Sequence, residues 1–586
     1  MDRARTDRLV LAAIGLAQGV VYWLAYRYWP AEGPAGAFAI APVVFVAVAG
    51  TAAQFAWTGR DRRRLTGIAA LTGAAFAIVA FWVWWQIPAM GAATYRGDQS
   101  RTSSWWPAAL IALYALGPYV QIFQRTGRFR FPYADLFFHS WCNFFIGAMG
   151  QVFVGVFWAL IRLWGALFGL LGIEFFAHVF NSSWFNALAL PAVFGYGVAR
   201  GRESARITES ARSAALAVFR FLLPLLAVIG LLFLVSLPFT GLAPLWATRR
   251  AAWILLTMVA LTLLFVNAVF EDGVGEPPYV PVVRFGVEAT ILALPIFAGL
   301  GLQALSLRID QYGLTPERFK GLVVGAVLGV YALGYAVAVL VRRGPWLGAL
   351  RPVNVALSFV VASVALLLHT PVLDPPAWSA RAQLARLVSG RADAEKFDYA
   401  YLRFFLGRVG FETLARIEGL EADPRREIMR AGVRLARDLK GYDYRYGTQE
   451  VADVLRGEHL VLGAGLEAAP EDLVPRIAAD LTRSERENCV RERTCCLFAV
   501  DLNADGTAEY CLLLRSLSRY QAPCWEHGEQ GWRRLGRLRP WNEAEASEAV
   551  VSPPDLADRL GATGAQAVPS RYVDVQIGDA RFRLQP

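Results

Sequence analysis

Charged residues are scarce in this sequence. They make up 18% of its 586 residues, hydrophobic residues make up 56%, and the mean hydropathy is +0.38. Because a soluble domain usually contains about 25% charged residues, this composition excludes a purely soluble protein. It indicates that a lipid bilayer is part of the solvent of this chain.

Several signatures of enzymes are also missing. The sequence has no Walker phosphate-binding loop, no Gly-x-Ser-x-Gly elbow and no His-Glu-x-x-His zinc site. A polytopic glycosyltransferase should carry a pair of acidic residues in an early outer loop. Here the first such loop offers Glu32 alone and the second only Asp98. Enzyme activity is therefore the least favoured of the functions considered below.

The apolar residues gather in runs of about 17 to 25, the length that a helix needs to cross about 30 Å of hydrocarbon. About 11 runs meet this criterion and predict transmembrane helices. The predicted spans are 9–28, 37–57, 65–87, 106–123, 141–161, 184–198, 214–237, 251–270, 285–305, 321–341 and 353–368.

A further apolar run, 163–180, contains Glu174 and His178 together with many Phe, Trp and Gly residues. This composition favours an amphipathic segment that is interfacial or re-entrant. The first span follows several arginines, as a signal peptide would. It is too long for one and lacks a small-residue cleavage site, so we expect a retained helix.

Basic residues fall unevenly on the two sides of the predicted spans. With the N-terminus in the cytoplasm, the cytoplasmic loops receive about 18 of them and the opposite loops about 9, as the positive-inside rule requires. An odd number of spans places the chain after residue 368 outside the cytoplasm. We therefore expect residues 1–370 to form the transmembrane domain of a multi-pass protein of the bacterial inner membrane.

The net charge of +10 could otherwise indicate nucleic-acid binding. Residues 1–377 carry about 28 basic and 16 acidic residues, and the remainder about 30 and 32, so the basic excess belongs to the membrane part. There it sets orientation and favours anionic lipid headgroups. The predicted partner is the lipid bilayer, with a possible periplasmic or membrane protein partner, and no nucleic acid.

Residues 371–586 have charges of both signs and no long apolar run. Helical periodicity covers 379–439, whereas alternating strand-like stretches predict β-structure within 490–586. The predicted fold class is an α-helical polytopic membrane protein with a C-terminal soluble α+β domain. By the topology above, that domain is periplasmic.

Most of the cysteines crowd into this C-terminal domain. In an oxidising compartment such crowding favours disulfides, although the sequence does not choose their pairing. A zinc site is a rival interpretation, but no Cys-x-x-Cys pair is present and His527 is the only nearby imidazole. Unpaired thiols are the third interpretation. The disulfide candidates are Cys489, Cys495, Cys496, Cys511 and Cys524.

The run DLNADGTAE places oxygen donors at alternate positions with Gly506 at the sixth, as a calcium loop requires. Position twelve, however, is Leu512 rather than glutamate, and the flanks look like strands. A strand-turn-strand connection is the favoured alternative, and no other cofactor is predicted. The calcium candidates are Asp501, Asn503, Asp505, Thr507 and Glu509.

Ionisable groups in or beside the spans are candidates for function, because an unpaired charge is costly in lipid. Arg220 lies in the seventh span, and Arg284 precedes Glu288 by one helical turn, so these two can pair. Asp135 and His139 have the same spacing before the fifth span. A structural ion pair or snorkelling near the membrane surface is the favoured interpretation of these charges, and a coupled proton or ion pathway is the alternative.

Two outer loops look more ordered than simple connectors. The run 236–246 interrupts apolar residues with Pro and Gly, as in an interface-hugging turn. The run 308–319 has Gly313 for a turn, then Thr315 as an N-cap and Pro316 at the first helical position of span ten.

Several of these runs together resemble an uncharacterised bacterial family of polytopic membrane proteins, domain of unknown function 4153. The similarity spans about 133–410 and implies an integral inner-membrane protein with an exported C-terminal domain, without implying an activity. The runs that carry it are YADLFF from Tyr133, the segment 157–180, SLPFTGL, VNAVFEDG, DQYGLTPERF and HTPVLDP from His369.

The sequence thus predicts a membrane protein that acts in sensing, scaffolding or envelope homeostasis. A transporter or channel for a small solute or ion is the main alternative. A membrane enzyme acting on a lipid-linked substrate is the third.

Overall fold

The computed structural model describes residues 3–28, 35–87, 97–248, 250–341 and 346–438, together with shorter stretches between 461 and 582. The chain divides into two compact units, Met1–Tyr442 and Asp443–Pro586. The first unit is helical and the second contains a small β-sheet.

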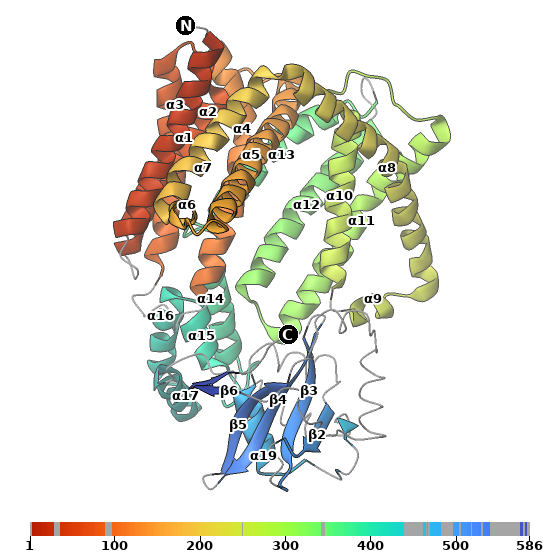
Figure 1. The fold of residues 1–586 in the computed structure, drawn as a ribbon. Helices are drawn as coiled ribbons and strands as arrows, with labels where there is room; N and C mark the ends of the chain where they lie inside the picture. Colours follow the sequence, from red (N-terminus) through yellow and green to blue (C-terminus); the bar gives the residue numbers. More distant parts are fainter. Residues whose placement is uncertain are drawn as a thin grey trace. The chain divides into compact units, whose positions relative to one another are not determined.

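Long helices make up most of the first unit (Figure 1). Among the helices that the structure describes, ten are long and apolar enough to span a membrane. The fold is therefore that of a polytopic helical protein with a C-terminal domain, as predicted. The helices of the membrane part are α1 (Arg3–Tyr28), α2 (Ala35–Ala56), α3 (Arg62–Trp85), α4 (Gly97–Thr126), α5 (Tyr133–Gly169), α6 (Phe175–Asn181), α7 (Ser183–Glu203), α8 (Ala205–Thr240), α9 (Ala243–Ala247), α10 (Ala251–Phe270), α11 (Pro281–Tyr312), α12 (Pro316–Val341) and α13 (Leu350–Leu367).

The predicted span 184–198 forms α7, which is not among those ten helices. It lies against α1 so closely that a Cβ added to Gly15 would be 2.0 Å from the carbonyl oxygen of Pro191. Near the opposite end of the contact, Arg8 pairs with Glu203 at 2.8 Å. Helices α1 and α7 therefore run antiparallel, and the end of α7 lies beside the start of α1.

The predicted interfacial segment 163–180 forms a helical hairpin. Helix α5 continues for 37 residues to Gly169, the chain turns at Gly172 with φ +76°, and α6 packs back on α5. The tip of the hairpin exposes Leu170 and Phe175. Exposed side chains of this kind are typical of a surface in contact with lipid or another apolar partner.

The two largest clusters of buried side chains in the described membrane part lie in different groups of helices. One joins α8, α10, α11 and α12, which we call the C-terminal bundle. The other joins α2, α3 and α4, and with α1, α5 and α7 these form the N-terminal bundle. Helix α13 packs against α4 of one bundle and α12 of the other. The membrane part is therefore two helix bundles that share one element.

Helix α12 begins as its sequence predicts. Thr315 Oγ1 accepts a hydrogen bond from the backbone N–H of Arg318 at 3.3 Å, and Pro316 is the first helical residue. Gly313 has a φ of +80°, which ends α11 in a conformation that side chains other than glycine rarely adopt. This N-cap and turn are confirmed.

Four shorter helices follow α13 and belong to the first unit. They have a core of their own, which includes Leu387, Leu402 and Leu414. Ser379 donates a hydrogen bond to the carbonyl oxygen of Leu314 at 2.8 Å, so this group packs where α12 begins. These helices are α14 (Pro375–Val388), α15 (Tyr399–Phe405), α16 (Arg408–Glu418) and α17 (Arg426–Asp438).

The second unit contains a five-stranded sheet with strand order β1-β2-β3-β4-β5. Strands β1 and β2 are parallel and the other neighbours are antiparallel. Helix α19 (Leu473–Asp480) packs on the sheet through Leu473 and Ile477. The strands are β1 (Val461–Leu462), β2 (Cys496–Val500), β3 (Glu509–Ser516), β4 (Arg519–Gly528) and β5 (Gly531–Leu538), with a separate hairpin of β6 (Val575–Ile577) and β7 (Ala580–Phe582).

Candidate functional site

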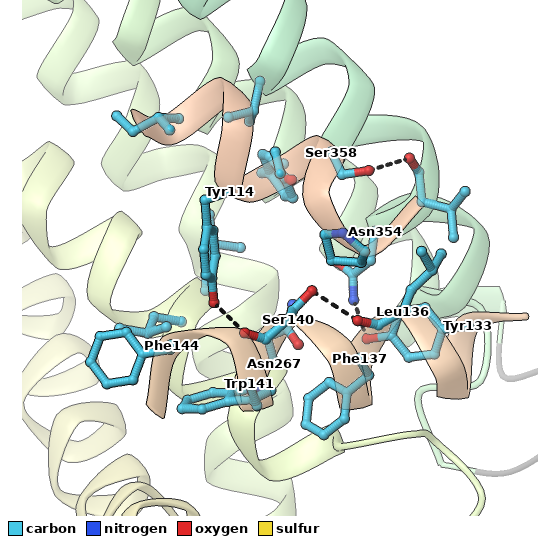
Figure 2. Close-up of a pocket in the computed structure, with 18 of the residues that line it drawn as sticks. Tyr114, Tyr133, Leu136, Phe137, Ser140, Trp141, Phe144, Asn267, Asn354 and Ser358 are labelled. Carbon is cyan, nitrogen blue, oxygen red and sulfur yellow. Dashed lines mark hydrogen bonds between the residues drawn. The ribbon is translucent and has the colours of Figure 1, made fainter. Parts of the chain in front are cut away.

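A cavity of about 580 Å³ lies between the two bundles. Its walls come from α4, α5 and α13 on one side and from α8, α10 and α12 on the other. Figure 2 shows its residues, with Tyr114 of α4 reaching toward α5 and Asn354 of α13 reaching toward Tyr133. The cavity lies where the two bundles meet, beside a small buried cluster that Phe137 of α5 shares with Leu216 of α8 and Ala268 of α10.

Four uncharged side chains from four helices form a polar network at one end of the cavity. Tyr335 donates a hydrogen bond to Asn354 Oδ1 at 2.7 Å, and Asn354 Nδ2 donates to the Tyr133 hydroxyl at 2.9 Å. Asn267 Nδ2 lies 3.5 Å from the Tyr335 hydroxyl, at the limit of a hydrogen bond. We call these residues the inter-bundle network, since they join α10 and α12 to α5 and α13.

Two further hydrogen-bonded contacts lie along the wall. Tyr119 and Ser358 join their hydroxyls at 2.7 Å, and Tyr114 donates to the backbone carbonyl of Ser140 at 2.9 Å. Each contact uses an uncharged group, and each holds α4 against a neighbouring helix. The wall is therefore positioned by hydrogen bonds rather than by ion pairs.

The opposite end of the cavity is aromatic and aliphatic. Trp141 and Phe144 lie two to three turns into α5, and Leu264 and Phe219 face them from α10 and α8. The lining residues Ile111, Phe144 and Leu264 are also exposed on the surface of the bundle. The cavity therefore reaches the lipid-facing surface.

A second cavity of about 430 Å³ lies on the other face of α5. Gln121 of α4 and Asn143 of α5 line this second cavity and form a reciprocal pair of side-chain hydrogen bonds, 2.8 and 3.0 Å long. Arg202 lines this second cavity, but its guanidinium donates to backbone carbonyls at the end of α2, including those of Phe55 and Trp57. Its charge therefore caps a helix C-terminus.

The charged residues predicted from the sequence lie outside the inter-bundle cavity. His139 lines the second cavity, and Asp135 pairs with Arg125 at 3.5 Å. Arg220 pairs with Glu271 of the neighbouring chain segment at 2.9 Å. Arg125 and Asp135 lie at the adjoining ends of α4 and α5, whereas Arg220 lies within α8 and Glu271 directly follows α10.

Arg284 and Glu288 pair at 2.7 Å, as their spacing predicts. Glu288 also accepts a hydrogen bond from the indole N–H of Trp346 at 2.8 Å. Because Trp346 precedes α13, this group ties α11 to the connection between α12 and α13. The geometry is that of a structural ion pair.

A buried ion pair joins Arg101 of α4 to Asp374, the residue before α14. Neither residue was predicted from the sequence as part of a site. The nitrogen and oxygen are 2.9 Å apart, and the side chains are only 9% and 6% exposed. Burial raises the pKa of the Asp374 carboxyl, and the adjacent Arg101 charge opposes this shift. The pair fastens α14 to the start of α4.

His369 lies beside this pair. Its Nε2 is 3.1 Å from the Ser104 hydroxyl and its Nδ1 is 3.0 Å from the carbonyl oxygen of Ala365. Burial lowers the pKa of the imidazole, and the Lys320 and Arg101 charges act in the same direction. The signal for this cluster was present in the run HTPVLDP, which places a histidine and an acid directly after the last predicted span.

In the second unit, a disulfide joins Cys511 and Cys524, which are directly opposite each other on β3 and β4. Cys496 is a buried free thiol, and burial raises its pKa to about 11. Cys489 and Cys495 lie outside the described residues. A disulfide in the C-terminal region is thus confirmed.

Asp501 and Glu509 of the predicted calcium loop accept backbone hydrogen bonds. The N–H of Gly506 donates to Asp501 at 3.0 Å, and that of Leu502 donates to Glu509 at 2.6 Å. These contacts are what a strand-turn-strand connection requires. Thr507 lies in the same turn, and Asn503 and Asp505 lie outside the described residues. Calcium binding stays a prediction.

Metal ligands do not cluster elsewhere in the part of the chain that the structure describes. No group of three or more His, Cys, Asp or Glu side chains there could hold a metal ion. The inter-bundle cavity, with its hydrogen-bonding end and apolar wall, is the arrangement best suited to hold a ligand.

The spanning helices and the two bundles define a multi-pass helical membrane protein. Residues 35–417 match a family described as a domain of unknown function (DUF4153), so the chain belongs to that family. The matched range contains every helix that lines the inter-bundle cavity and also the Arg101–Asp374 pair. Neither a curated protein nor a solved structure matches the chain.

Proposed function

We propose that this protein binds a lipid-like molecule between its two helix bundles and thereby acts in envelope homeostasis, as a sensor or scaffold. The inter-bundle cavity carries this proposal. Its volume of about 580 Å³ lies in the range typical of ligand pockets, about 300–1,000 Å³. An apolar wall with a few hydrogen-bonding groups suits an amphipathic molecule.

The opening of the cavity toward the helical surface also supports lipid binding. Ile111 and Phe144 line the cavity and are exposed at the helical surface, so a lipid could enter sideways from the bilayer. The apolar lining near this opening offers a surface against which lipid chains could lie.

The placement in a bacterial inner membrane, with a periplasmic C-terminal domain, belongs to the proposal. The uneven loop charges support it, because basic residues remain on the cytoplasmic side. The Cys511–Cys524 disulfide supports export of the second unit, since such bonds persist in oxidising compartments. Reporter fusions near Arg62 and at the C-terminus test this topology; a cytoplasmic C-terminus would contradict it.

Filling the cavity tests the binding function. Ala260→Trp places an indole in the cavity, whereas Leu110→Trp adds one to an exposed position on α4 outside it. We expect lipid extracted from the purified Ala260→Trp protein to fall at least about tenfold below the wild-type amount for the retained species. The Leu110→Trp protein should keep it. Equal lipid content in all three proteins would contradict the proposal.

A transporter is the second candidate, and the two-bundle architecture favours it. Transporters often bind substrate at the interface of two bundles that rock against each other, and the cavity lies at such an interface. Flux measured in proteoliposomes separates the candidates. Ligand binding without flux supports a sensor or scaffold, and flux blocked by Ala260→Trp supports a transporter.

A further inference from the structure

The lining of the inter-bundle cavity is uncharged. None of the described residues that line it is Asp, Glu, Lys, Arg or His. Arg351 flanks the network from outside the lining, where its guanidinium donates to the carbonyl oxygen of Gly273, and Arg220 is paired with Glu271. A phosphate among the lining side chains would therefore contact no cationic side chain, which is unfavourable away from water.

The inter-bundle network also leaves hydrogen-bonding capacity for a ligand. A tyrosine hydroxyl has one hydrogen and can also accept. Tyr133 accepts from Asn354, and among the described residues its own hydrogen has no acceptor. In the same described set, the Tyr331 hydroxyl and Asn267 Oδ1 have no hydrogen-bond partner. The cavity thus offers two donors and one acceptor, all neutral.

Most groups of the polar end lie near helix ends on one side of the cavity, and Tyr331 lies one turn before Tyr335 on α12. Tyr133 is the first residue of α5, Asn354 lies in the second turn of α13, and Asn267 lies in the last turn of α10. Trp141 and Phe144 lie deeper along α5. The polar end therefore faces the membrane surface on the side where α5 and α13 begin, and the apolar end faces the bilayer centre. A lipid of that leaflet has the same orientation, with its polar head at the membrane surface and its chains toward the bilayer centre.

On the basis of the proposed lipid binding, we infer that the ligand is an uncharged lipid with a hydroxyl or carbonyl head, such as a diacylglycerol. Tyr133, Tyr331 and Asn267 hydrogen-bond the head, and the chains lie against Trp141 and Phe144. Anionic phospholipids of the same leaflet are excluded because no cationic side chain lines the cavity to contact their phosphate.

Two photo-reactive probes test this inference on the full-length protein in nanodiscs. One is a diacylglycerol with a diazirine in its acyl chain, and the other is a phosphatidylglycerol with the same chains. Peptide mapping by mass spectrometry then locates the labels. We expect the diacylglycerol probe to label the cavity segments of α5 and α12 at least about tenfold more than the phosphatidylglycerol probe does.

Tyr331→Phe removes a donor without breaking a described hydrogen bond, so this variant should fold normally. It should lower diacylglycerol labelling of the cavity about two- to fivefold, while Tyr22→Phe, at an exposed tyrosine of α1, should leave it unchanged. Equal or stronger cavity labelling by phosphatidylglycerol would overturn the inference and leave lipid binding standing. Cavity labelling no stronger than that of α1 by either probe would overturn both.

Discussion

Two clusters of polar side chains in the described membrane unit differ in charge and in access. The inter-bundle network is built from Tyr133, Asn267, Tyr335 and Asn354, and it borders an open cavity. The cluster around the Arg101–Asp374 pair contains full charges and is closed, with side chains 9% and 6% exposed.

The difference in charge and access indicates that the ion pair and the inter-bundle network have different roles. A buried ion pair leaves a strongly unfavourable lone charge when it is broken, so it resists opening and suits a permanent connection. Neutral hydroxyls and amides lose less when partners are exchanged, so they can accept a ligand and release it. The ion pair therefore suits a permanent connection of α14 to α4, and the network suits the proposed ligand binding.

The largest expected effect is on stability at the ion pair. Asp374→Ala leaves the Arg101 charge buried without its partner and should lower the free energy of unfolding by about 3–5 kcal/mol. The double variant Arg101→Leu with Asp374→Leu should recover much of this loss. Thermal unfolding in detergent measures both.

A matched control is the exposed pair of Arg437 and Glu418, with side chains 44% and 40% exposed. Glu418→Ala should cost less than about 1 kcal/mol. If Asp374→Ala lowered the free energy of unfolding no more than Glu418→Ala does, the buried Arg101–Asp374 pair would be no more important for stability than an exposed ion pair.

The next effect separates binding from stability. Asn354→Leu breaks two hydrogen bonds of the inter-bundle network and should cost about 1–3 kcal/mol. Asn143→Leu breaks the reciprocal pair with Gln121 on the other face of α5 and should cost a similar amount. Mass spectrometry of co-purified lipid should show a loss only for Asn354→Leu. Equal lipid loss in both would mean that stability alone controls retention.

A smaller effect should follow pH at His369. Its pKa is lowered in the folded state by burial, so the unfolded chain binds the proton more readily. Stability should therefore decrease as pH falls through the usual histidine value of about 6.5, and should stop decreasing below the lowered folded value. Melting temperatures from about pH 7.5 to about pH 5.5 measure this, and His369→Asn should flatten that part of the profile.

The smallest effect on stability is expected at Tyr331. Tyr331→Phe should change the free energy of unfolding by no more than about 0.5 kcal/mol, because no described hydrogen bond is lost. The same variant should still weaken lipid retention. A stability loss comparable to that of Asn354→Leu would show that the Tyr331 hydroxyl has a structural partner rather than a ligand.

Features that are local in the sequence could be predicted. Spanning helices follow from the length of apolar runs, the start of α12 follows from Thr315 and Pro316, and the Arg284–Glu288 pair follows from a four-residue spacing. Crowded cysteines predicted disulfides, but the pairing of Cys511 with Cys524 required the register of β3 on β4.

The cavity could not be predicted, because its residues are distant in the sequence and individually ordinary. Tyr133 and Asn354 are 221 residues apart, and an uncharged tyrosine or asparagine in a span gives no signal like that of a lone charge. The ion pair of Arg101 and Asp374 could not be predicted for the same reason, because the two residues are 273 positions apart in the sequence. The charged residues of the spans therefore gave no indication of the inter-bundle cavity, whose described lining is neutral.

Electron cryo-microscopy of the wild-type protein in nanodiscs of native lipid tests the central claim most directly. We expect elongated non-protein density in the inter-bundle cavity, with its polar end at Tyr133 and its tail along Trp141, and no such density in Ala260→Trp. A wild-type cavity that is empty, or closed by its own side chains, would contradict the account.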